Sequence, residues 1–142
     1  MKKNIILSIL LLAAMQVFAL PNLIGRWQTA PMWDGLVKTE LELNFLDSVN
    51  FDIKVVVDNT EFSEGTRTTM TMRGTYQMRD SLCIFTADLS TFTAIPAPLP
   101  GRVVTDLNNV DSLIIMPSRN SEDVMALVSD SGYEVIVLYR QK

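Results

Sequence analysis

Histidine is absent from all 142 residues, and this absence limits the chemistry that the chain could perform. Histidine is the usual general base, the commonest metal ligand and the partner of most serine or cysteine nucleophiles. Serine–histidine and cysteine–histidine catalysis are therefore excluded. The chain also has no glycine-rich loop that could cradle a phosphate. We expect a protein that is not an enzyme and that uses neither a metal nor a cofactor.

The remaining side chains that could take part in a reaction are carboxylates and one thiol. Glu40, Glu42 and Asp52 fall on polar positions of alternating segments, and Asp47 lies in a turn. Such positions are typical of a solvated surface rather than of a pair of carboxylates poised for acid–base catalysis. Cys83 lies in the apolar run Leu-Cys-Ile-Phe, which indicates a buried small hydrophobe rather than a reactive thiol.

Apolar side chains are then the groups best suited to binding. If the strands described below close into a barrel, one parity of each strand faces inward. This parity makes five residues candidates for the lining of a pocket: Phe51, Ile53, Met70, Met72 and Met78. Methionine is flexible and polarisable, so it suits a site that adapts to varied apolar ligands. The same residues could equally fill a solid core, and the sequence leaves both alternatives open.

The elements that would position these residues are β-strands. Apolar and polar residues alternate through 36–45 and 49–57, and a turn at Asp47 and Ser48 joins these two runs into a hairpin. No convincing helical stripe follows residue 19. Eight strands in up-and-down order predict an all-β fold that closes into an antiparallel barrel, with a β-sandwich as the alternative. The other six predicted strands are 25–29, 66–78, 82–93, 110–116, 124–129 and 133–140.

A proline-rich connection covers residues 95–101, in which Pro96, Pro98 and Pro100 are spaced two apart. Proline has no amide donor, so this segment cannot lie in the centre of a sheet. We interpret it as a long surface connection. A lid or a segment that docks a partner is the alternative, because long ordered loops are often functional.

The first nineteen residues predict export. Lys2 and Lys3 precede an apolar run over 5–14, and the stretch ends on Ala19, a small residue that signal peptidases accept. The run is shorter than the about 20 apolar residues that a membrane-spanning helix needs. We therefore expect a cleaved signal peptide over 1–19 and one domain over 20–142, in a periplasm or secreted and not inserted in a membrane. The residue directly after the cleavage point is Leu20 and not a cysteine, so lipidation there is not expected.

Charge and cysteine content narrow the classes of partner. The chain has 12 basic and 16 acidic residues, a net charge of −4, and removal of Lys2 and Lys3 leaves 10 against 16, a net charge of −6. Nucleic acids and anionic membranes are approached with clustered lysine and arginine, so neither is expected as a partner. The single cysteine rules out a disulfide within the chain.

Three short motifs mark the first strand, the central hairpin and the last strand. Gly25 and Trp27 form Gly-x-Trp, Gly74 and Tyr76 form Gly-x-Tyr, and Arg140 ends the last strand. In this order the motifs resemble the lipocalin and fatty-acid-binding group of calycin-type barrels, most closely the short bacterial lipocalin-like proteins. The resemblance implies that the tryptophan plugs the closed end of the barrel and that the arginine stacks on it. Gly25, Trp27 and Arg140 would then be the residues that close the barrel.

The resemblance also implies a function. It predicts a protein that binds a small apolar or amphipathic molecule inside its barrel without catalysis. The chain lacks the C-terminal helix and the disulfide of full-length lipocalins, and it lacks the helical pair of fatty-acid-binding proteins. The alternative from a different class is an interaction module without an internal ligand, which would engage an envelope or secreted protein through its outer surface or through 95–101.

Overall fold

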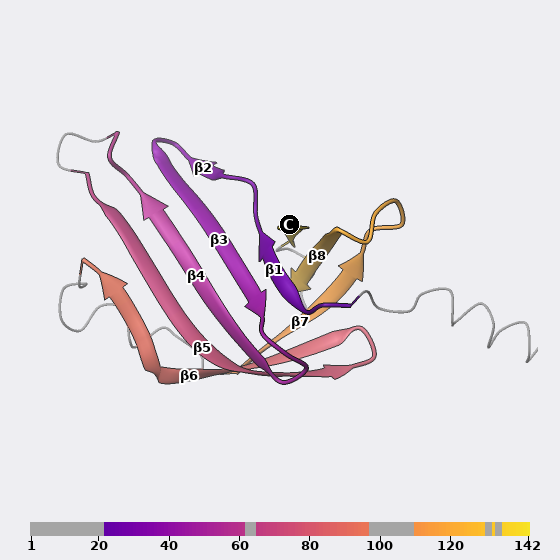
Figure 1. Ribbon diagram of the computed structural model, residues 1–142. Coiled ribbons are helices and arrows are strands. Elements are labelled where there is room, and N and C mark those ends of the chain that lie inside the picture. Colours follow the sequence, from indigo (N-terminus) through magenta and orange to yellow (C-terminus); the bar gives the residue numbers. More distant parts are fainter. Residues whose placement is uncertain (1–21, 62–64, 97–109, 130–131, 133–134) are drawn as a thin grey trace, which may run out of the picture.

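The described residues form nine antiparallel strands and no helix (Figure 1). The computed structural model describes residues 22–61, 65–96, 110–129, 132 and 135–142. The predicted signal peptide and residues 97–101 of the proline-rich connection lie outside this part of the chain. The strands are β1 (Gly25–Gln28), β2 (Met32–Asp34), β3 (Val37–Phe45), β4 (Asn50–Asp58), β5 (Arg67–Arg79), β6 (Leu82–Ile95), β7 (Val110–Pro117), β8 (Val124–Ser129) and β9 (Val135–Arg140).

Eight of these strands close into a barrel. Each strand from β3 to β9 pairs with the next one along the chain, and β1 completes the ring by pairing with both β9 and β3. Trp27 lies in register with Leu43 on one side and with Arg140 on the other, and the next residue, Gln28, is likewise paired with both β3 and β9. The predicted up-and-down antiparallel barrel is thereby confirmed. The alternative of a β-sandwich is wrong, since one continuous sheet closes on itself.

The strand β2 is an element that the alternation of the sequence does not predict. It folds back on the start of β3, where Trp33 lies opposite Lys38. Gly35 makes the tight turn between the two strands with a φ of +60°, a conformation that glycine adopts without strain. Three residues are too few to show a period of two, so sequence patterning alone does not reveal this hairpin.

The turn between β3 and β4 is organised by Asp47. Its carboxylate accepts hydrogen bonds from the backbone amides of Val49 (2.8 Å) and Asn50 (2.7 Å) and from the Asn50 side chain. The bond from that side chain, followed by the two amides, lowers the pKa of Asp47. Tyr76 on β5 donates its hydroxyl to the Asp47 carbonyl oxygen, and burial raises the pKa of this phenol. The predicted hairpin is thus present and is tied to the neighbouring strand.

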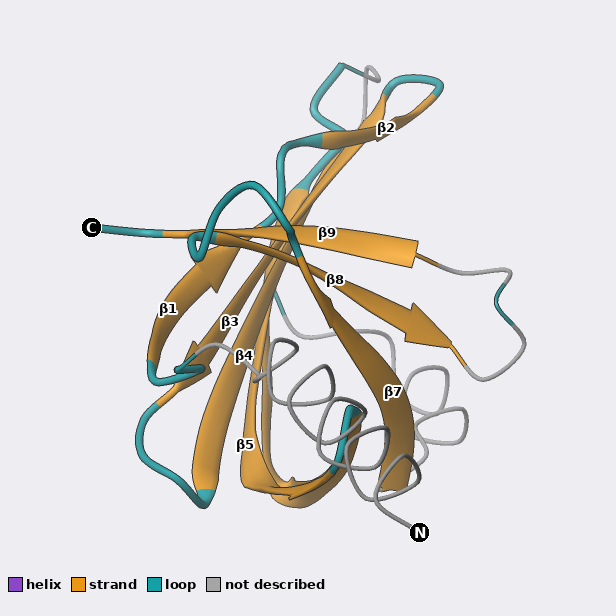
Figure 2. Cartoon of the chain, turned by 90° about the vertical axis from the view of Figure 1, so that its right-hand side faces the viewer, coloured by secondary structure: helices purple, strands orange, loops and turns teal. Residues whose placement is uncertain are grey.

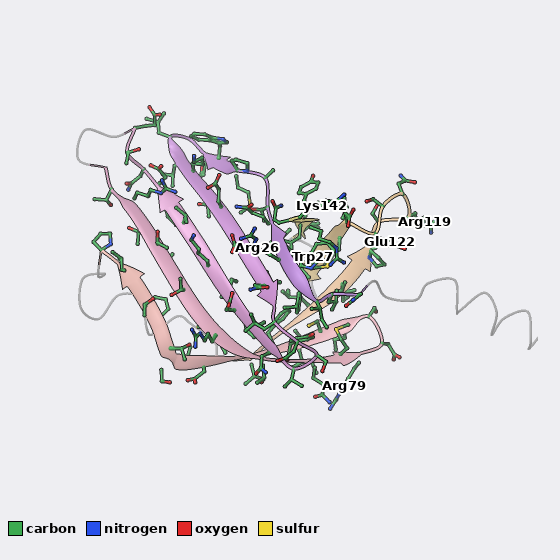
Figure 3. All side chains as sticks on the ribbon, in the orientation of Figure 1. Arg26, Trp27, Arg79, Arg119, Glu122 and Lys142 are labelled. Carbon is green, nitrogen blue, oxygen red and sulfur yellow. The ribbon has the colours of Figure 1, made fainter. Side chains whose placement is uncertain are left out.

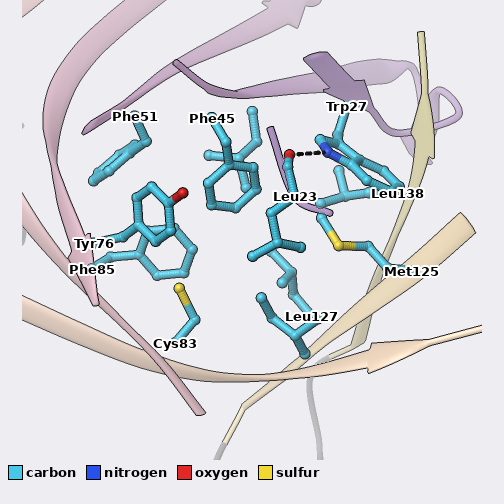
Figure 4. Close-up of a cluster of buried hydrophobic side chains, with 12 residues drawn as sticks. Leu23, Trp27, Phe45, Phe51, Tyr76, Cys83, Phe85, Met125, Leu127 and Leu138 are labelled. Carbon is cyan, nitrogen blue, oxygen red and sulfur yellow. Dashed lines mark hydrogen bonds between the residues drawn. The ribbon is translucent and has the colours of Figure 1, made fainter. Parts of the chain in front are cut away.

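The core fills one end of the barrel. Phe45 packs edge-on against Tyr76 with ring centroids 4.7 Å apart, and Phe51 does the same against Phe85 at 5.2 Å. Edge-to-face pairs of this kind add to the free energy gained by burying the rings. Around them lie the other buried members of the cluster (Figure 4): Leu23, Trp27, Leu43, Cys83, Ile115, Met125, Leu127 and Leu138.

At the other end of the barrel the described strands are unequally paired, and we call this end the open half. β7 pairs with only residues 82–86 of β6, so within the described chain residues 87–95 of β6 are hydrogen-bonded on the β5 side alone. Figure 1 shows β3 to β6 as a broad curved sheet that extends past β1, β7 and β8. The barrel therefore has a closed half that is filled by the core and an open half that is built mainly from β3 to β6.

Candidate functional site

The five residues predicted to face the interior separate into two groups. All five lie on the face of β4 and β5 that carries the core. Phe51 is buried within the core cluster, and Ile53 and Met78 pack against it. Met70 and Met72 are half-buried and lie outside that cluster, in the open half. Phe51 is therefore part of the packed core. The side chains of Met70 and Met72 remain partly accessible to solvent, so a bound molecule could cover them.

The two methionines belong to an apolar surface on the inner face of the open half. Leu41, Val55, Met70 and Ala94 stand opposite one another in a row across β3, β4, β5 and β6. All the side chains of this surface are half-buried, and none of them is charged. We call the surface the inner strip, and its members are Leu41, Ile53, Val55, Val57, Met70, Met72 and Ala94.

The opposite end of the barrel is sealed by Trp27 and Arg140. The indole is fully buried and donates its Nε1–H to the Leu23 carbonyl oxygen at 2.8 Å. The guanidinium carbon of Arg140 lies 4.3 Å from the centroid of the indole. Arg140 also donates to the backbone carbonyl of Ile24 (2.9 Å) and forms an ion pair with Asp123 (3.2 Å). The resemblance implies this stacked arrangement, which ties the segment before β1 to the end of β9.

Gly25 allows the chain to pass close to that guanidinium. Its φ is +127°, in the region that side chains rarely adopt, and a Cβ there would lie 3.3 Å from Nη1 of Arg140. Both the backbone angle and the contact favour glycine. The Gly-x-Trp motif therefore has a local physical reason at the closed end, independent of any ligand.

A hollow lies mainly on the outer face, at an irregularity between β5 and β6 that sequence reasoning missed. The register of β5 and β6 shifts between Thr71 and Arg73, so residues 89–92 stand opposite one residue of β5. Asp88 accepts hydrogen bonds from the amide (3.1 Å) and the hydroxyl of Ser90, and Thr91 accepts the amide of Arg73 at 2.9 Å. The signal for this bulge is the turn-forming run Asp-x-Ser-Thr inside a predicted strand.

The outer hollow is polar and open. Its volume is about 470 Å³, and its lining contains one carboxylate, one guanidinium and three hydroxyl groups: Asp52, Thr71, Met72, Arg73, Thr91 and Thr93. These groups offer hydrogen bonds, and Met72, which also belongs to the inner strip, adds apolar surface. The inner strip is the better candidate for the apolar ligand that the resemblance implies, because all of its members are apolar.

Cys83 should be inert in the folded protein. It is fully buried in the core, and burial raises the pKa of its thiol from 9.0 to about 12. At pH 8 we expect no reaction with a disulfide reagent until the protein unfolds, because the thiolate is the reactive form. Above pH 9 the unfolded chain loses this proton before the folded chain does, so the free energy of unfolding should fall between pH 9 and pH 12.

Titration of the Cys83 thiol with a disulfide reagent, with and without denaturant, tests this expectation. A variant with an additional cysteine at the exposed position Thr75 is the positive control, since its new thiol should react at once. Rapid reaction of the natural protein without denaturant would show that the core opens around Cys83.

Among the described residues, no group of three or more histidine, cysteine, aspartate or glutamate side chains could hold a metal ion. No helix long and apolar enough to cross a membrane occurs in the same part of the chain.

A scan against protein-family models and a search of curated proteins both give no match to this sequence. Function is therefore inferred from the geometry of the barrel.

Proposed function

We propose that this chain is an exported, lipocalin-like protein that binds a small apolar or amphipathic molecule on the inner strip, without catalysing a reaction. The observation that supports this function most is the inner strip itself. Half-buried hydrocarbon on the inside of an open barrel is exposed to water until something covers it. Covering apolar surface is favourable by about 25 cal/mol per Å², part of which is offset by the cost of association.

The positions of the three motifs support the lipocalin-like part of the proposal. Trp27 and Arg140 stack at the closed end, as described above. In the central motif, Gly74 lies opposite Phe51 and Tyr76 lies opposite Phe85. The motif residues thus surround the core of the closed half and leave the open half for a ligand.

Charge at the rim suggests how an amphipathic ligand would be oriented. The inner strip has no charged side chain, so an apolar tail fits along it. Lys38, Asp58 and Arg67 lie in register with one another at the rim end of β3, β4 and β5, on the outer face of these strands. A polar headgroup that projects past the rim would lie toward these residues, where it keeps contact with water and with charge.

Replacing Met70 by lysine should weaken ligand binding at least about tenfold, because a bound tail would force the new ammonium group to lose water without a partner. The measurement is a titration of residues 20–142 with a fluorescent fatty acid, displaced by unlabelled fatty acids, with native mass spectrometry as a second readout. Trp33 at the rim offers an intrinsic reporter, since it is exposed and Lys38 lies 5.9 Å from its ring centroid.

The matched control is Thr69→Lys. Thr69 is the neighbour of Met70 on β5 but lies on the opposite face of the strand, in register with Val56. The Thr69→Lys variant gains the same charge as the Met70→Lys variant, and it should bind the probe as tightly as the natural protein does. Equal loss in both variants, or no binding by the natural protein, would contradict the proposed site.

The alternative function, an interaction module for another envelope or secreted protein, is favoured by a different observation. Apolar side chains are exposed on the outer faces of β7 and β9, and the outer apolar residues of β8 between them are half-buried. This face is on the outside of the barrel, so an interaction there is compatible with a ligand on the inner strip.

A further inference from the structure

The strands β7, β8 and β9 are apolar on both faces. Their inner positions include Ile115, Met125 and Leu138, which are buried in the core. Their outer positions from Ile114 onward are also apolar, although they face away from the core. We call this outer surface the β7–β9 patch, and its members are Ile114, Met116, Val124, Ala126, Val128, Val135, Val137 and Tyr139.

The patch is continuous and open to solvent. Met116 lies opposite Ala126, and Ala126 lies opposite Val137 on the next strand. The exposed fractions are 54% for Met116, 57% for Val135, 41% for Val137 and 44% for Tyr139. Figure 2 shows β7, β8 and β9 side by side on the side of the barrel that faces the viewer. The accessible apolar area is on the order of 400 Å², within the range of the largest patches on monomeric proteins, which are often functional.

The rest of the outer surface shows that this composition is not general. The outer positions of β3 and β4 include Lys38, Glu40, Glu42, Asp52 and Lys54. Strands that are apolar on both faces are typical of sheets that are covered on both faces. The β7–β9 patch therefore has the composition of a surface that another apolar surface covers.

The β7–β9 patch has no charged side chain, and this restricts the chemistry of the surface that could cover it. A charged side chain placed against the patch would lose its water and find no partner, which is costly. The partner must therefore present an uncharged sheet or groove. The patch itself has this property, and a two-fold axis would place one patch against another, as two sheets pack about 10 Å apart.

The area and the rim agree with such a pairing. Homodimer interfaces are about 65% apolar, so on the order of 400 Å² of apolar surface corresponds to roughly 600 Å² buried per partner, at the lower end of specific interfaces. Charged residues of both signs lie at one end of these strands, since Arg119 and Glu122 lie between β7 and β8 and Lys142 follows β9; Figure 3 labels all three. A two-fold axis that runs along the strands would bring these ends together, so that opposite charges can face one another. We infer that this chain forms a two-fold dimer through the β7–β9 patch.

Sedimentation of residues 20–142 from about 1 µM to about 1 mM covers the range in which weak dimers dissociate. The natural protein should shift from monomer to dimer with concentration, and Val137→Lys should raise the dissociation constant at least about tenfold because two ammonium groups would be buried without partners. Thr75→Lys is the matched control, since it adds the same charge at an exposed position of β5 and should leave dimerisation unchanged. Val137 is already exposed, so the monomer should tolerate lysine, and circular dichroism checks this.

A distance measurement gives a second readout that does not depend on the lysine variant. Cys83 is buried, so a cysteine introduced as Val137→Cys can be labelled selectively with a nitroxide. In the dimer, pairs of labels should lie on the order of 10–25 Å apart, because facing sheets pack about 10 Å apart. The same label in Thr75→Cys should give no such short distance.

Three outcomes would overturn the inference. The first is a monomer throughout the concentration range without short label distances. The second is a dimer that Val137→Lys leaves intact, which would place the interface elsewhere. The third is a monomer that floats with lipid vesicles or co-purifies with another envelope protein through Val137, which would assign the patch to that partner instead.

Discussion

Replacing Trp27 by alanine is expected to lower the free energy of unfolding by about 4 kcal/mol. The indole is fully buried, and its removal would leave a cavity at the closed end of the barrel. The Leu23 carbonyl would lose its hydrogen bond, and the guanidinium of Arg140 would lose the ring on which it stacks. All three effects act where β1 joins β9 and β3, so closure of the barrel should weaken as a whole.

Urea unfolding followed by far-ultraviolet circular dichroism measures this loss without relying on tryptophan emission. Trp33→Ala is the matched control, because Trp33 is 60% exposed and loses only a distant contact with Lys38. Its loss should stay below about 1 kcal/mol. If Trp27→Ala were no more destabilising than Trp33→Ala, the closed end would not depend on the indole.

Replacing Gly74 by alanine is expected to cost about 2–3 kcal/mol. A Cβ at this position would lie 2.2 Å from the Thr86 carbonyl oxygen and 2.8 Å from Cε1 of Phe51. The Phe51 ring could adjust, but the carbonyl belongs to the backbone of β6, which is paired with β5 at this point. The two strands would have to separate locally, beside the aromatic core.

The comparison variant for Gly74→Ala is Gly35→Ala, and both are measured by urea unfolding. Nothing lies within 4 Å of a Cβ at Gly35, so that change costs only the strain of a φ of +60°, about 1 kcal/mol. Adding Phe51→Leu to Gly74→Ala should not restore stability, since the carbonyl contact persists. An unchanged urea midpoint for Gly74→Ala would mean that β6 can move away from β5 without cost.

Much of the fold follows from the local pattern of the sequence. The predicted strand 49–57 is found as Asn50–Asp58, and the predicted strand 124–129 is found as Val124–Ser129. The parity of Phe51, Ile53 and Met72 is likewise predicted, because successive side chains of a pleated strand point to opposite faces. The β2 strand and the bulge at 89–92 escape prediction for opposite reasons. The first is too short to show a period. The second is shaped by hydrogen bonds that override the period: the Asp88 carboxylate accepts one from the Ser90 amide, and the Thr91 hydroxyl donates one to the Asp88 carbonyl oxygen.

The candidate site could be predicted only in part. The alternation of the strands predicts that Phe51 and Met70 both face the interior of the barrel. In the structure, however, Phe51 is buried and Met70 is partly accessible. The difference arises because, within the described chain, β7 pairs only with residues 82–86 of β6, so the core forms beside Phe51 and stops before Met70. Likewise, the apolar runs of β8 and β9 are plain in the sequence, but the exposure of Val137 is not.

The sequence by itself determined the eight strands of the barrel, their order and, in the regular stretches, the face on which each side chain lies, since alternation is a property of neighbouring residues. Only the tertiary structure decided which apolar side chains form the core, which line the open half and which lie uncovered on the outside. Burial depends on which strands, distant along the chain, come to lie over a given residue, and no local period contains that information.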